Sequence, residues 1–149
     1  MINEIQTDVY RRIVEQTTDA IIFADREGLI RIWNQGAESV FGFPAEEVLG
    51  KSLDIIIPEE LRKRHWEAYS KAIAEGRTRT GDGVMVTRAL NKDGSRLYVD
   101  MSFAVIVDAS GHTEGALAIG RNITARYLAD KAVRKHVAEL EAVRSDNAI

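Results

Sequence analysis

The hydrophobic and polar positions of this chain follow two different periods, one typical of helices and one typical of strands. Apolar residues recur at helical spacing in residues 3–16, which predicts an amphipathic helix near the start of the chain. The runs at 19–25 and 29–34 are rich in β-branched and aromatic residues and flank a glycine-containing turn at 26–28. We therefore expect a β-hairpin directly after the first helix.

The middle of the chain has helical patterns that glycine and proline divide into short pieces. The predicted elements are helices over 35–41 and 45–49, one helical turn over 52–56, and a longer helix from Pro58 to about Ala74. Pro58 suits the first position of a helix, where no backbone hydrogen bond is lost. Gly42, Gly50 and Gly76 suit the left-handed position that follows a helix.

The last third of the chain returns to a period of two. Between 96 and 107, apolar residues such as Met101 and Phe103 alternate with polar ones, which predicts a half-buried antiparallel strand. The expected strands are 84–90, 96–107 and 115–122, with turns at 91–94 and 108–111, and a final helix covers 123–144. Together with the hairpin, this order predicts the α+β class, with one antiparallel sheet and helices on one of its faces.

Composition narrows the class and the location of the protein. Its 149 residues are 45% hydrophobic and 29% charged with a net charge of -3, which suits one globular domain and argues against a nucleic-acid partner. Apolar runs are far shorter than the roughly 18 residues of a membrane span, and the first residues lack the apolar segment of a signal peptide. With no cysteine, disulfides and thiolate sites are excluded. We expect a cytoplasmic protein with a flanking helix at 1–17, a core at 18–122 and a C-terminal helix, linker or dimerisation element at 123–149.

Short segments of the central region resemble the segments of one known family. They are Asp19-Ala20-Ile21-Ile22, Gly28, Ile32-Trp33-Asn34, Ala37-Glu38-Ser39-Val40-Phe41-Gly42-Phe43, Glu47-Val48-Leu49-Gly50-Lys51, Asn91-Lys92-Asp93-Gly94-Ser95 and Gly120-Arg121-Asn122-Ile123-Thr124. In this order and spacing they resemble the PAS domain family over residues 10–124, although Asn122 stands where the family usually has aspartate. The resemblance implies a PAS fold, in which a five-stranded antiparallel sheet cups a pocket against the helices of residues 35–75. It also implies a sensory or regulatory role and an ion pair between Glu38 and Lys51.

His65 is the strongest candidate for a ligand-binding residue. The chain has three histidines and no cysteine, and His65 is the one on the long helix beside the expected pocket. The residues Ile57, Pro58, Glu59, Arg62 and His65 match a pattern that resembles Ile-Pro-Glu-x-x-Arg-x-x-His of the haem-binding oxygen-sensor PAS domains. The resemblance implies that His65 coordinates haem b through the Nε2 atom of its neutral imidazole.

The same resemblance implies which side chains surround the haem. Lys71 would meet a propionate, while Arg77 and Arg79 are further basic candidates on a loop that otherwise reads as solvated. Met85 takes the place of the distal arginine of one branch, and Gly83 that of the axial methionine of another. The candidate cofactor-binding residues are His65, Trp66, Tyr69, Lys71, Met85, Met101 and Phe103, with Met101 and Phe103 on the distal wall or in the core.

Other cofactors and an empty pocket are alternatives to haem. The absence of cysteine excludes the photoactive flavin-adduct class and the class whose chromophore forms a thioester. A redox flavin stacked on Trp66 or Trp33 is a weaker alternative, because a tryptophan on a strand, such as Trp33, is more often a core residue. A cofactor-free module for protein interaction and dimerisation is the second function that the sequence supports.

The rest of the sequence has no pattern of an enzyme. Phosphate-binding loops, nucleophile elbows and paired-histidine metal motifs are missing, so we expect a non-enzymatic module. His112 and His136 are expected to be solvated. Val133, Val137 and Leu140 lie at i, i+4 and i+7 of the final helix, which favours a homodimer through the terminal helices or a connection to an output domain or signalling partner.

Overall fold

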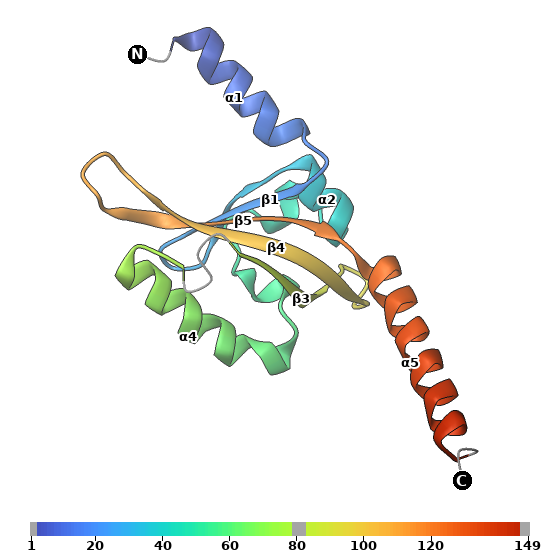
Figure 1. The fold of residues 1–149 in the computed structure, drawn as a ribbon. Helices are drawn as coiled ribbons and strands as arrows, with labels where there is room; N and C mark the ends of the chain where they lie inside the picture. Colours follow the sequence, from blue (N-terminus) through green and yellow to red (C-terminus); the bar gives the residue numbers. More distant parts are fainter. Residues whose placement is uncertain (1–2, 79–82, 147–149) are drawn as a thin grey trace.

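A computed structural model of the chain describes residues 3–78 and 83–146. Its elements are α1 (Glu4–Gln16), β1 (Ala20–Asp25), β2 (Ile30–Trp33), α2 (Gln35–Phe41), α3 (Ala45–Val48), the 3-10 helix η1 (Leu53–Ile56), α4 (Glu59–Glu75), β3 (Val84–Leu90), β4 (Arg96–Val107), β5 (Thr113–Asn122) and α5 (Thr124–Asp146). Figure 1 shows a twisted sheet with α4 along one side, while α1 and α5 project from it in different directions. The predicted order of helices and strands is confirmed.

All five strands form one antiparallel sheet in the order β2-β1-β5-β4-β3. β1 and β2 form the predicted hairpin, and β3, β4 and β5 form the predicted meander. The two parts join where β1 pairs with β5 at the centre of the sheet. The α+β class and the five-stranded antiparallel sheet are therefore confirmed.

The register of the sheet places Met85 and Met101 on the same face. These two residues are directly opposed on β3 and β4. The row continues through Gly120 of β5 to Ala20 of β1. Opposed residues of antiparallel strands point to the same side of a sheet. Because Met101 and Ala20 are buried, this row lies on the inner face, which the helices cover.

The hydrophobic core lies between this inner face and the helices α2, α3 and η1. Its buried side chains are Ala20, Ile22, Ala24, Ile30, Trp33, Ala37, Val40, Phe41, Val48, Leu53, Ile56, Ala89, Leu97, Val99 and Met101. Trp66 and Tyr69 of α4 are half-buried and pack against this cluster, as does Phe103 of β4. Each square ångström of apolar surface that is buried stabilises the fold by about 25 cal/mol. These contacts hold the helical layer against the sheet.

Asn34 is a buried polar residue that joins three elements. Its side-chain oxygen accepts hydrogen bonds from the backbone N–H groups of Ile21 and Ala37, and in this way it caps α2. Its side-chain nitrogen donates to the backbone oxygens of Val14 and Asp19. A buried polar group without a partner costs about 1–3 kcal/mol, so these bonds fix how the end of α1 and the start of β1 meet α2.

Some predicted boundaries differ from the structure. Pro58 is the N-cap residue of α4 with an extended backbone, so Glu59 is the first helical residue. β5 begins at Thr113, two residues earlier than predicted, because it pairs with β4 almost up to their connecting turn. α5 extends to Asp146. Each difference moves an end of an element and leaves its type unchanged.

The expected ion pair between Glu38 and Lys51 is absent from the part of the chain that the structure describes. The Glu38 carboxylate instead accepts a hydrogen bond of 2.8 Å from the backbone N–H of Ala45, at the start of α3. The nearby ion pair joins Lys92 to Glu47, at 2.7 Å, and ties the β3–β4 turn to α3. The prediction of this pair was wrong, and the observed partner of the Glu38 carboxylate is the first N–H of α3.

Both terminal helices carry apolar side chains that are exposed. On α1 these include Ile5, Val9 and Ile13, and on α5 they include Val133 and Leu140. Within residues 3–78 and 83–146, none of the helices has the length and apolar character that a membrane span requires.

Candidate functional site

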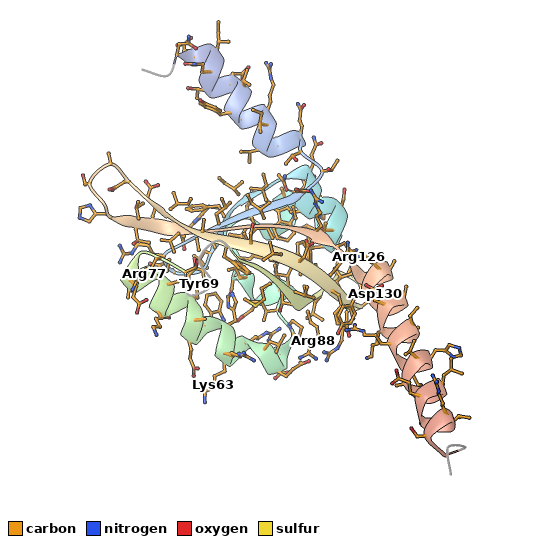
Figure 2. The ribbon with its side chains drawn as sticks, in the orientation of Figure 1. Lys63, Tyr69, Arg77, Arg88, Arg126 and Asp130 are labelled. Carbon is orange, nitrogen blue, oxygen red and sulfur yellow. The ribbon has the colours of Figure 1, made fainter. Side chains whose placement is uncertain are left out.

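Three aromatic side chains of α4 form a cluster on the side of the helix toward the sheet. The His65 ring meets Trp66 edge-on at 4.7 Å between ring centres and lies 5.8 Å from Tyr69. Trp66 and Tyr69 are themselves edge to face at 5.3 Å. Figure 2 shows Tyr69 between α4 and the strands. The structure therefore brings together three of the predicted site residues.

Tyr69 connects α4 to the end of β1. Its hydroxyl donates to the backbone oxygens of Ala24, at 3.2 Å, and Asp25. Burial, and then the charge of Asp25, raise the pKa of Tyr69 to about 12. The phenol is thus a neutral hydrogen-bond donor at any physiological pH. Its hydroxyl already donates to backbone oxygens, so a ligand beside Tyr69 would contact the ring.

Trp66 is fixed at both ends of its indole. Its Nε1 donates to Asp54 Oδ1 at 2.7 Å, which ties α4 to η1. The other end of the ring lies on Gly28, where a Cβ atom would be 2.3 Å from two ring carbons. Gly28 also has φ of +82°, a left-handed conformation that suits glycine. The β1–β2 turn, η1 and α4 therefore meet at this tryptophan.

His65 has a ring nitrogen without a partner. Its Nδ1 is buried and makes no hydrogen bond. Burial lowers the pKa of the imidazole below its ordinary value, and the opposing effect of the Asp54 carboxylate is smaller. The ring is therefore neutral near pH 7, which is the form that binds a metal ion. Buried polar atoms without partners are rare in proteins, so the Nδ1 of His65 lacks the hydrogen bond that a buried imidazole nitrogen usually makes.

Arg62 belongs to the sequence pattern that resembles the haem-binding subset, and in the structure its side chain holds two elements together. Its Nε donates to the backbone oxygen of Ile57 at 3.0 Å, and its Nη2 donates to that of Asp54 at 3.2 Å. The side chain thus closes the start of α4 onto η1. This contact sets the direction in which α4 leaves the turn, and with it the direction in which His65 faces.

Asp54 is the residue of this site that sequence reasoning missed. It accepts the Trp66 hydrogen bond and lies 4.0 Å from the Arg62 guanidinium. Its negative charge also partly offsets the effect by which burial lowers the pKa of His65. Nothing in the sequence separates Asp54 from other surface carboxylates, because its three partners come from a helix whose packing is set by the fold. The only local signal is Ser52, whose hydroxyl caps η1 at the Asp54 N–H.

Small residues and Met101 form the opposite wall on the sheet. Met101 is buried, and its sulfur lies 2.0 Å from where a Cβ atom on Gly120 would be. Ala118 and Gly120, neighbours on the inner face of β5, leave room that Met101 and Phe103 occupy from β4. Met85 lies at the edge of the same row and is 41% exposed. The strand residues of the predicted site therefore share one face.

The basic candidates lie farther from His65. Lys71 is exposed and lies about 120° around α4 from His65, at 100° per residue. Arg77 is also exposed, beyond the end of α4 (Figure 2). Arg79 lies outside the described residues. The structure thus places Lys71 and Arg77 on the surface of the protein, where each could contact only a ligand group that extends to the solvent.

Trp33 and the other histidines are separate from this cluster. Trp33 is buried in the core, with its ring 5.4 Å from Phe41 and its Nε1 bonded to the Phe43 oxygen. His112 and His136 are both exposed. Within residues 3–78 and 83–146, no group of three or more histidine, aspartate or glutamate side chains is arranged to hold a metal ion.

Comparison with known proteins gives this arrangement a family context. A family model described as the PAS fold matches residues 9–123. The chain is 28% identical over 94 residues to the oxygen sensor protein DosP of Escherichia coli, which covers 62% of this chain and 12% of that protein. It is 36% identical over 55 residues to the sensor protein FixL of Bradyrhizobium diazoefficiens, covering 37% of this chain and 11% of that protein. The chain thus spans about a tenth of the length of each of these two relatives.

A solved structure supports the fold independently. The crystal structure of the PAS domain of a protein from Colwellia psychrerythraea superposes with a TM-score of 0.70 at 23% identity. The match covers 80% of this chain and 98% of that one. At this level of identity the similarity concerns the fold alone.

Proposed function

Because this chain belongs to the PAS fold family, we propose that it is a non-enzymatic sensory module that binds a small ligand or cofactor between α4 and the inner face of the sheet. Haem b, held through His65, is the leading candidate. The observation that carries this proposal is the buried Nδ1 of a neutral imidazole that has no partner. The names of two relatives, an oxygen sensor and a sensor protein, support a sensory role.

The residues of the site divide into those that hold the group and those that shape its surroundings. His65 would supply the protein ligand to the metal, and haem iron would in turn bind a diatomic gas or change its redox state. Met101 and Phe103 would form an apolar wall that limits access of water. Trp66 and Tyr69 would hold α4 in place through Asp54 and the end of β1. Lys71 and Met85 would meet the edges of the group.

β4 offers a route from this site to α5. Met101 and Phe103 lie on its inner face, whereas Tyr98 lies on the opposite face. The Tyr98 N–H donates to Thr124 Oγ1 at 3.0 Å, and its ring stacks on Tyr127 at 3.9 Å between ring centres. A ligand that displaces Met101 would move the strand to which the start of α5 is bound. Signal transmission would then pass through α5 to an output domain or partner.

A cofactor-free interaction module is the second candidate function. The observation that favours it is the exposure of apolar side chains on both terminal helices, including Ile5 on α1 and Leu140 on α5. Exposed apolar stripes of this kind mark contacts with other proteins. In this case the protein would act through dimerisation without a bound cofactor.

An absorption spectrum separates the two functions. Apoprotein titrated with haemin is expected to develop a Soret band that saturates at one haem per chain, and His65→Ala is expected to lose it. His136→Ala is the matched control, because it removes an exposed histidine far along α5. A protein that stays colourless with added haemin would contradict haem binding, as would a His65→Ala variant with an unchanged spectrum.

A further inference from the structure

β3 is an edge strand at one side of the sheet (Figure 1). Among the strands formed by residues 3–78 and 83–146, β4 is the one that pairs with it. The pairing runs from Val84 to Leu90 in one register without a bulge. An edge strand presents a row of backbone groups to which a further strand can bond. The direction of these groups decides whether β3 can accept one.

The backbone of β3 has hydrogen-bonding groups that point away from the sheet. Tyr98 of β4 uses its N–H and its carbonyl oxygen on the β5 side, where they bond Thr124 Oγ1 and the Ile123 N–H. In an antiparallel pair, a residue whose backbone points away from the partner strand is opposite a residue that does the same. Arg88 is opposite Tyr98, so its N–H and carbonyl oxygen point outward. The same holds for every second residue toward the start of β3.

The first half of β3 lacks the features that usually protect an edge. Val84 and Val86 are 66% and 52% exposed, and residues 84–87 include no charged residue and no proline. Natural edge strands avoid further pairing through charges, prolines, bulges or short length. β3 instead combines outward backbone groups with exposed β-branched side chains, and this combination favours an added strand.

The other edge strand, β2, is closed to such an addition. It has four residues, and its pairing with β1 contains a shift in register. The Ile30 N–H donates to the Lys51 carbonyl oxygen, and the Ile30 carbonyl oxygen accepts from the Gly50 N–H, so the outer side of β2 is already bonded. Arg31 also places a charge within the strand. A further strand would therefore add at β3.

Arg88 gives the β3 edge a positive charge. The Glu60 carboxylate of α4 lies 2.5 Å from the Arg96 guanidinium and 4.0 Å from that of Arg88. One carboxylate is thus shared by two guanidinium groups, and Figure 2 shows Arg88 beside the start of α4. Asp100, on the same face of the sheet, accepts the Arg121 N–H on the β5 side of β4. A carboxylate on an added strand would therefore complement Arg88.

We propose that β3 binds an extended segment of another protein as a further antiparallel strand, and that this segment has a carboxylate followed by apolar side chains at alternate residues. The carboxylate lies opposite Arg88, and the apolar side chains lie opposite Val86 and Val84. Opposed residues share one face of a sheet, so each of these pairs is in contact. β3 itself has no carboxylate, so β3 of a second copy would leave Arg88 without this complement. The inference goes beyond the proposed ligand site, because it requires no bound cofactor.

A synthetic peptide tests the backbone pairing. Fluorescein-Ser-Glu-Thr-Val-Thr-Val-Ser-amide places its glutamate opposite Arg88, and fluorescence anisotropy measures its binding to the full chain. Methylation of the backbone nitrogen of its first valine removes a hydrogen bond to β3 and is expected to weaken binding at least about tenfold. Methylation of the threonine before it, whose N–H points away from β3, is the matched control and is expected to change binding less than about twofold. Equal effects of the two methyl groups, or no binding at millimolar concentration, would overturn the proposal.

Reversal of the charge tests where the peptide lies along β3. Arg88→Glu is expected to weaken binding of the glutamate peptide about fivefold or more. The same variant is expected to bind more tightly a peptide with lysine in place of that glutamate. Arg134→Glu, at an exposed position of α5, is the control and leaves the preference for glutamate unchanged. An Arg88→Glu variant that still prefers the glutamate peptide would overturn the proposed pairing.

Amide hydrogen exchange followed by NMR identifies the edge that the peptide occupies. In the free protein, the N–H groups of Val84, Val86 and Arg88 are expected to exchange faster than those of Met85 and Thr87, which face β4. The peptide is expected to slow the exchange of the first three at least about tenfold. Protection that appears on β2 instead would overturn the proposal.

Sedimentation of the full chain distinguishes a second copy from a different partner. The proposal predicts that any self-association is unaffected by the peptide. A dimer that the peptide dissociates would show that a second copy occupies β3, and would overturn the proposal. A protein that binds the peptide but stays colourless with haemin would refute haem binding and leave the β3 site intact.

Discussion

The indole of Trp66 rests on Gly28, so that a Cβ atom at Gly28 would lie 2.3 Å from its ring. This contact joins α4 to the β1–β2 turn, although the two residues are far apart in the sequence. It fixes which side of α4 faces the sheet, and with it the positions of His65 and Tyr69. The geometry of the candidate site therefore depends on the absence of a side chain at Gly28.

Replacement of Gly28 tests that dependence. Gly28→Ala is expected to lower the free energy of unfolding by about 2–5 kcal/mol, from the left-handed backbone and from the overlap with Trp66. Gly94→Ala is a matched control, because Gly94 has φ of +85° and no atom within 4 Å of its Cβ position. Its cost is expected to be about 1–2 kcal/mol, from the backbone alone. Equal losses for the two variants in urea unfolding would contradict the role of Trp66.

The neutral state of His65 predicts how stability depends on pH. Burial lowers the pKa of His65 in the folded protein, so between that pKa and the ordinary value near 6.5 the unfolded chain binds more protons. The contribution of His65 to stability is therefore fully present above pH 6.5 and falls as the pH is lowered. Apoprotein is expected to lose stability between pH 7.5 and 5.5 in urea unfolding, and His65→Leu is expected to lose less. A steeper loss in His65→Leu would contradict a buried neutral imidazole.

The Tyr69 hydroxyl allows an independent test of the contact between α4 and β1. Tyr69→Phe keeps the ring and removes the hydroxyl that donates to Ala24 and Asp25, so stability is expected to fall by about 1 kcal/mol. Because the pKa of Tyr69 is about 12, one of the four tyrosines is expected to remain protonated at pH 11. Ultraviolet titration of Tyr69→Phe should lack this late step. A late step that persists would assign it to another tyrosine.

The stacked rings of Tyr98 and Tyr127 predict a measurable coupling between the sheet and α5. A double-mutant cycle with Tyr98→Ala and Tyr127→Ala is expected to give an interaction energy of about 0.5–1.5 kcal/mol. Leu128→Ala, at an exposed position next to Tyr127, is the control and should show no coupling with Tyr98→Ala. An interaction energy of zero would contradict a role of this contact in transmitting a signal to α5.

The elements of the fold were predictable because their signals are local. The alternation around Met101, the glycines after the helices and the turn at 26–28 all act within a few residues, and each element was found at or near its predicted position. The expected ion pair between Glu38 and Lys51 is not formed, and Glu38 accepts a hydrogen bond from the backbone N–H of Ala45 instead.

The contacts that build the site were not predictable in this way. The sequence pattern singled out His65, but the bonds of Asp54 to Trp66 and the contact of Trp66 with Gly28 form only when α4 packs on η1 and the hairpin. The opposition of Met85 and Met101 follows from the strand register, which the sequence leaves open by one or two residues. Side-chain partners across elements therefore required the structure.

The proposed coordination of haem by His65 can be tested by chemical rescue with imidazole. His65→Gly removes the imidazole and leaves a space that free imidazole can enter. This variant with haemin is expected to lack the wild-type Soret band and to regain it when imidazole is added. An absorption spectrum that is the same for the wild type and for His65→Gly without imidazole would contradict the claim.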